Sequence, residues 1–159
     1  MKNPARPASW STPRPGPAAA SAALALLLAP ALAWASVPGV SLSKPWLRFL
    51  TPQIPAAGYF TLSNGTDHAM VLTGAASQDC GTLMLHQSVV ENGTAQMKMV
   101  PDVVVPPHGS VTFQPGGYHL MCVSPAAAIH PGAHVPVMLK FKDGSAVDAD
   151  FPVYGAKGP

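Results

Sequence analysis

The stretch "HVPVMLKFKDG" (His134–Gly144) is followed almost at once by "AVDADFPVY" (Ala146–Tyr154). Both runs contain the valine and aromatic residues that favour strands, and the Asp143-Gly144 pair between them is a hairpin signal. We therefore predict two antiparallel strands here. The same pattern of short runs between turn signals extends back along the chain as far as Pro45.

The runs upstream of this hairpin give a further set of expected strands. Turn signals separate them at Asn64-Gly65, Asn92-Gly93 and Pro131-Gly132. The Pro-rich segment "VVVPPHG" must be a loop or an edge, because proline cannot donate to a ladder. Many short strands at this spacing imply an all-β antiparallel sandwich or barrel. The expected strands are "PWLRFL", "AAGYFTLSN", "AMVLTGAAS", "TLMLHQSVV", "AQMKMV", "SVTFQP" and "GYHLMCV".

Residues 1–35 have the character of a secretory signal peptide. A basic start that contains Lys2, Arg6 and Arg14 precedes an apolar run, and Ala33-Trp34-Ala35 forms a small-x-small cleavage pattern. The apolar run is short and contains Pro30, which argues against a membrane anchor. We expect cleavage after Ala35, a single domain over residues 36–159, and a periplasmic protein with neither a membrane span nor a lipid anchor.

The charges that remain after this leader exclude several classes of function. Six basic and seven acidic residues give a net charge of −1, and no Lys/Arg cluster survives, so nucleic-acid binding has no electrostatic support. The acidic residues are scattered, with no close pair suited to hydrolysis, and no Gly-rich phosphate loop is present. We expect a protein that is not an enzyme.

The stretch "GYHLMCV" (117–123) brings three soft metal-binding side chains close together. Residues two apart in a strand share a face, so His119 and Met121 should point one way and Cys122 the other. The same alternation puts His86 on a face with Met84. Since soft sulfur ligands favour Cu(I) and imidazole also suits copper, the pattern indicates a copper site.

Met97 shares a strand face with Met99, and the spacing of these residues is specific. Ten residues separate His86 from Met97, twenty-one separate Met97 from His119, and one separates His119 from Met121. This H-x10-M-x21-H-x-M series, with "GYFTLSN", "LHQSVVENGTAQM" and "VPPHGSVTFQPGGYHLM", resembles the periplasmic copper chaperones of the PCu(A)C type. The resemblance covers roughly residues 45–153.

The resemblance implies a cupredoxin-like antiparallel Greek-key β-sandwich that binds one Cu(I) per monomer. Carried over residue by residue, the metal ligands are His86, Met97, His119 and Met121. The family's role implies delivery of copper to the binuclear copper site of cytochrome c oxidase subunit II, often alongside a Sco-type thiol protein. Where many relatives have a methionine two residues after the first histidine, this chain has Ser88.

Several alternatives stay open at the level of sequence. Cys80 and Cys122 could form a disulfide outside the cytoplasm or remain two separate thiols, and separate thiols are slightly favoured. Met84 and Met99 could assist the metal. An electron-transfer cupredoxin would use Cys122 with His130, His134 and Met138, although the spacing is too wide, and a periplasmic copper buffer or tolerance protein would use the same four ligands as a chaperone.

Overall fold

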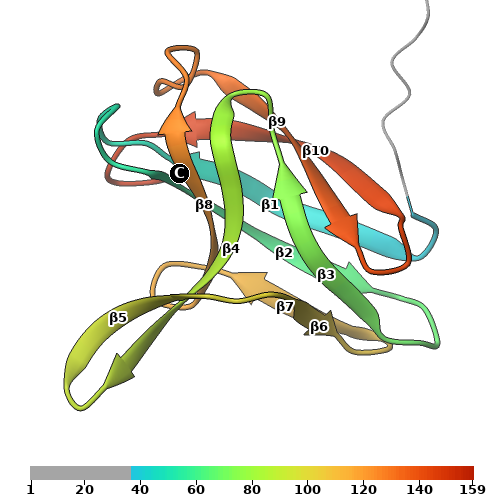
Figure 1. Cartoon of the computed structure of the whole chain (residues 1–159). Helices are drawn as coiled ribbons and strands as arrows, with labels where there is room; N and C mark the ends of the chain where they lie inside the picture. Colours follow the sequence, from blue (N-terminus) through green and yellow to red (C-terminus); the bar gives the residue numbers. More distant parts are fainter. Residues whose placement is uncertain (1–36) are drawn as a thin grey trace, which may run out of the picture. The chain divides into compact units, whose positions relative to one another are not determined.

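A computed structural model describes residues 37–159, and the predicted leader lies outside the described residues. The described chain is all-β, as the sequence predicts, and it contains ten strands (Figure 1). Within this part of the chain no helix is long and apolar enough to cross a membrane. The strands are β1 (Val40–Arg48), β2 (Ala56–Asn64), β3 (Met70–Ala76), β4 (Cys80–Glu91), β5 (Thr94–Met99), β6 (Val103–Val105), β7 (Gly109–Phe113), β8 (Tyr118–Pro125), β9 (His134–Phe141) and β10 (Ala146–Tyr154).

The strands form one continuous hydrogen-bonded order, β5-β4-β8-β7-β2-β1-β10-β9-β3-β6. A short parallel pairing of β1 with β10 joins the two parts of this sheet, while most other neighbours are antiparallel. The sheet folds over, so that β3 also lies against β4 and β6 against β7. The Greek-key, cupredoxin-like arrangement remains a prediction.

Side chains from both parts of the folded sheet enclose one core. Phe60 stacks on Phe113 with ring centroids 4.3 Å apart and meets Phe151 edge to face at 5.8 Å. Leu72 and Leu139 enter from the far strands and are fully buried. Burying such large apolar side chains contributes roughly 1.5–3 kcal/mol each, so this core is the main stabilising element of the sheet.

Prolines account for the largest differences from the predicted strand limits. β1 begins at Val40 instead of Pro45, because a bulge between Ser43 and Trp46, with Lys44 at φ 51°, accommodates the proline within the strand. The segment "VVVPPHG" supplies β6, which is the last strand of the sheet order and has only β3 as its ladder partner. The expectation that this segment forms a loop or an edge is therefore confirmed.

The hairpin of β4 and β5 extends away from the rest of the sheet (Figure 1). Its loop is the predicted Asn92-Gly93 turn, in which both residues have positive φ. All six residues of β5 are exposed, and among the strands of residues 37–159 only β4 lies next to it in the sheet. The hairpin therefore offers one open face beside the β4–β8 ladder, where the predicted ligands lie.

Candidate metal centre

The β4–β8 ladder brings two of the four predicted ligands directly opposite each other. His86 pairs with His119, and their ring centroids lie 5.8 Å apart in an edge-on arrangement. The neighbouring pair is Met84 with Met121. Because directly opposite residues of antiparallel strands point to the same face, both imidazoles and both thioethers lie on one side of the sheet.

The β4–β5 ladder adds the third predicted ligand to this face. Met97 pairs with Ser88, and Met99 pairs with His86. Ser88 and His86 are two apart on β4, so Met97 also points to the side that carries His119 and Met121. The structure thus places His86, Met97, His119 and Met121 on one face of three adjacent strands.

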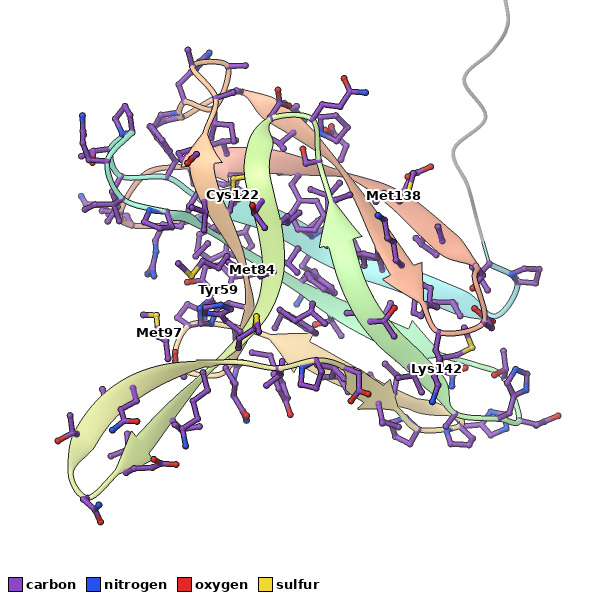
Figure 2. The ribbon with its side chains drawn as sticks, in the orientation of Figure 1. Tyr59, Met84, Met97, Cys122, Met138 and Lys142 are labelled. Carbon is purple, nitrogen blue, oxygen red and sulfur yellow. A yellow bond between two sulfur atoms is a disulfide. The ribbon has the colours of Figure 1, made fainter. Side chains whose placement is uncertain are left out.

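A pocket of about 320 Å³ opens on this face. Met97, His119 and Met121 line it, and Figure 2 shows Met97 reaching from the hairpin toward Tyr59, which also lines it. His86 is not part of the lining but lies against the ring of His119. Figure 2 places Met138 far from this group, on β9.

Burial within the site is graded from one side to the other. His119 is only 6% exposed, whereas Met97 is 69% exposed. His86 and Met121 are intermediate. An ion held here would therefore have a buried imidazole beneath it and an exposed thioether at the surface, so a partner can approach from the methionine side.

The turn before β8 orients the more buried imidazole. Gly116 adopts a φ of 81°, and the Gly117 N–H donates to the Gln114 carbonyl at 3.0 Å. The Gly117 carbonyl accepts from the Ser88 N–H at 3.0 Å and lies 3.2 Å from His119 Nδ1. With its proton on Nδ1, His119 donates to this carbonyl and leaves Nε2 free for a metal, the arrangement that metal-binding histidines commonly use.

His86 carries an unpartnered polar atom at this position. Its Nδ1 is buried and has no hydrogen-bond partner among the described residues. Burial, and then the nearby His119, lower the pKa of His86 below its ordinary value of 6.5. The imidazole therefore stays neutral near pH 7, which is the form that binds metals.

The donor set fits a soft monovalent cation. No group of three His, Cys, Asp or Glu side chains that could hold a metal ion occurs in residues 37–159, so the donors here are two imidazoles supplemented only by thioethers. Calcium and magnesium require several oxygen ligands, and structural zinc sites use thiolates or additional histidines. Neutral sulfur and imidazole donors suit Cu(I).

The expectation of two separate cysteine thiols is wrong. Cys80 and Cys122 form a disulfide, with Cα atoms 5.4 Å apart, and the described residues contain no free cysteine. Cys122 is fully buried, on the face opposite the site, as strand alternation predicts. Two cysteines in a chain predicted to be secreted were the available signal for a disulfide.

The disulfide also removes the cysteine that the electron-transfer alternative needs. A blue-copper centre requires a free thiolate, and Cys122 has none. The accompanying histidines of that alternative, His130 and His134, are exposed, as expected from their positions beside a Pro-Gly turn. The copper-transferring alternatives, which need only the Met/His face, are unaffected.

Sequence reasoning did not identify the wall of the pocket that β1, β2 and their loop supply. Arg48, Leu50 and Ile54 line this wall, and the two apolar side chains are each 48% exposed. The Arg48 guanidinium lies 5.5 Å from the ring centroid of Tyr59. Burial raises the pKa of Tyr59, although Arg48 partly opposes this effect. The sequence could not predict this wall, because Phe49 and Leu50 at the end of a predicted strand look the same whether they line a pocket or pack in the core.

Comparison with known proteins places the chain in a family. The model of the family described as "Putative lipoprotein LpqE-like" matches residues 40–153, almost the whole described domain. The chain belongs to the LpqE-like family. Within curated relatives, it is 32% identical over 121 residues to "Putative lipoprotein Lxx21020" of Leifsonia xyli, covering 76% of this chain and 72% of that one. It is 26% identical over 114 residues to "Uncharacterized protein RP573" of Rickettsia prowazekii, with coverages of 67% and 61%.

Solved structures confirm the resemblance between this LpqE-like chain and the PCu(A)C type. The solution structure of the Cu(I) form of DR1885 from Deinococcus radiodurans is 30% identical, with a TM-score of 0.60, covering 74% of this chain and 79% of that one. The copper-bound PCuAC domain of PmoF2 shares the fold, with a TM-score of 0.63 at 24% identity and coverages of 78% and 99%. The names of LpqE-like relatives as lipoproteins agree with a cell-envelope protein and give no support to the expectation that a lipid anchor is absent.

Proposed function

We propose that this protein is a Cu(I)-binding metallochaperone of the periplasm that holds one copper ion between His86, Met97, His119 and Met121. The observation that supports the proposal most strongly is the direct pairing of His86 with His119, with Met121 and Met97 on the same open face. Similarity to domains solved in their copper-bound forms is the second support. Copper is here a cargo, so no catalysis is involved.

The graded burial of the site suits a carrier. The two imidazoles sit on the paired strands β4 and β8, and the exposed Met97 sits on an edge strand. A thioether that faces solvent can be replaced by a ligand of an acceptor while the imidazoles still hold the ion. Neutral donors leave the single positive charge of Cu(I) in place and disfavour oxidation to Cu(II), which prefers nitrogen and oxygen donors in a tetragonal geometry.

We further infer that the acceptor is the binuclear copper site of cytochrome c oxidase subunit II, with a Sco-type thiol protein as a companion. The protein would act as a monomer with a cupredoxin-like Greek-key fold. This assignment rests on the PCu(A)C resemblance. The alternative use of the same site is copper buffering or tolerance, in which copper is bound but not passed to the oxidase.

Titration with Cu(I) against a chromophoric chelator tests the binding. We expect tight binding of one equivalent, a large loss in His86→Ala and Met121→Ala, and no change in Met138→Leu, which alters a half-exposed methionine on β9. Weak binding that survives the substitutions in the site would refute the proposal. Transfer from the loaded protein to a soluble oxidase copper-site fragment then tests the acceptor, and intact binding without transfer would favour buffering.

A further inference from the structure

Met99 occupies a position that the four-ligand spacing does not include. It lies directly opposite His86 in the β4–β5 ladder, while Met97 lies opposite Ser88. His119, His86 and Met99 therefore form one row across three adjacent strands. Opposite residues in such a ladder have Cβ atoms about 4.5–5.5 Å apart, so Met99 is the methionine of β5 nearer to His86 along the ladder.

The two methionines of β5 are equally accessible and face the same way. Met97 is 69% exposed and Met99 is 68% exposed. Lys98 between them points to the other face, where it forms an ion pair with Glu91. The face of β5 that carries the thioethers thus has no cationic side chain of its own, so a metal cation there meets no repulsion from the strand.

The exposure of this pair is not explained by packing. Methionine in proteins mostly fills gaps in cores, and edge strands usually carry charged residues that prevent association. On β5 both methionines stay in solvent: Met97 lines the pocket, and Met99 lies outside its lining but opposite His86 in the ladder. Two thioethers therefore lie on the strand face next to His86, whose Nδ1 has no hydrogen-bond partner among the described residues.

We propose that Met99 is an additional Cu(I) ligand that exchanges with Met97, so that the two thioethers of β5 form an outer position through which copper enters and leaves the imidazole pair. This inference rests on the proposed copper-carrying function. Either thioether can complete the site while the other is free. An incoming acceptor ligand displaces one of them without exposing the copper to water on all sides.

The test compares Met97→Leu, Met99→Leu and the double variant with wild type, because leucine removes the sulfur while nearly conserving apolar volume. Met138→Leu is the matched control, a partly exposed methionine on the other part of the sheet. Competition against a chromophoric chelator gives the dissociation constant for Cu(I). We expect each single variant to raise it by at most about tenfold, the lower end of the scale on which a supporting residue changes metal affinity, because the other thioether still completes the site. In the double variant, the fold increase of the dissociation constant should exceed the product of the fold increases in the two single variants.

NMR of the methionine methyl groups, recorded on the whole protein with and without one equivalent of Cu(I), separates ligation from an effect on packing. The Met97, Met99 and Met121 signals should shift, while those of buried Met70 and remote Met138 should not. An unshifted Met99 signal, or a Met99→Leu affinity equal to that of Met138→Leu, would overturn this inference and leave the proposed function intact. Wild-type protein that fails to bind Cu(I) tightly would overturn both.

Discussion

Reduction of the Cys80–Cys122 bond should remove a large share of the protein's stability. The bond closes a loop with a sequence separation of 42 residues. In the chain-entropy account, a loop of this length lowers the entropy of the unfolded chain by about 13 cal/mol/K, which corresponds to about 4 kcal/mol at 25 °C. Since domains of this size are stable by roughly 5–15 kcal/mol, reduction should remove between about a quarter and four-fifths of the stability.

Urea unfolding of the oxidised and reduced protein measures this effect, with thiol titration to establish the redox state. The Cys80→Ala/Cys122→Ala variant is the control, because it should resemble the reduced protein and should not respond to reductant. The m-value, which is the slope of the unfolding free energy against urea concentration, should increase on reduction, because an unfolded chain without the crosslink exposes more surface. A reduced protein that unfolds within about 1 kcal/mol of the oxidised one would refute the loop-closure reasoning.

Two further outcomes follow from individual side chains. Because the pKa of His86 is lowered in the folded protein, the unfolded chain takes up a proton at a higher pH than the folded chain does. Copper-free protein should therefore lose stability as the pH falls below about 6.5. Thermal unfolding at several pH values measures this loss, and His86→Ala should make it smaller. Asn64→Ala should cost roughly 2–3 kcal/mol in urea unfolding, because the buried amide donates to the carbonyls of His68, Val105 and Pro106. The Cu(I) affinity of Asn64→Ala should match that of wild type, because the hydrogen bonds of Asn64 do not involve the predicted ligands. A folded Asn64→Ala protein that binds Cu(I) weakly would contradict this.

Local patterns were sufficient to predict the strands and the division of β8 into two faces. Alternation alone separates His119 and Met121 from Leu120 and Cys122, and the pocket agrees, because its lining contains the first two residues and neither of the other two. Turn chemistry is local in the same way, because Gly116 adopts the positive φ that glycine allows in the turn before β8. These features depend on neighbours in sequence, which is why they can be inferred without coordinates.

The disulfide depends instead on how two distant strands are aligned. In the ladder Cys122 lies opposite Leu83 and Cys80 lies opposite Pro125, so a regular register would keep the sulfurs apart. Ser124 has a φ of 51° at the irregular end of β8, and the cysteine Cα atoms there are only 5.4 Å apart. A left-handed serine has no reliable sequence signal, so strand alternation alone could not predict this pairing.

The position of Met99 shows the same limit beside the candidate metal centre. Sequence spacing gives the number of residues between the predicted ligands. It does not give the ladder register, which decides which methionine of β5 lies opposite which residue of β4. A shift of one residue would turn both thioethers away from the imidazoles. The short Asn92-Gly93 turn holds the register, because it fixes how far each strand runs before the chain reverses.

The site joins two halves that are supported differently. His86 and His119 lie on strands joined by a ladder and by the Cys80–Cys122 bond, and the Gly117 carbonyl accepts from the Ser88 N–H across them. Met97 and Met99 lie on an exposed edge strand that has β4 as its only ladder partner. A segment with few and exposed interactions unfolds locally at a low free-energy cost, whereas a crosslinked and buried segment does not. The proposed carrier function needs this division, because a firmly placed imidazole pair would retain the ion while the thioether side would yield to an acceptor.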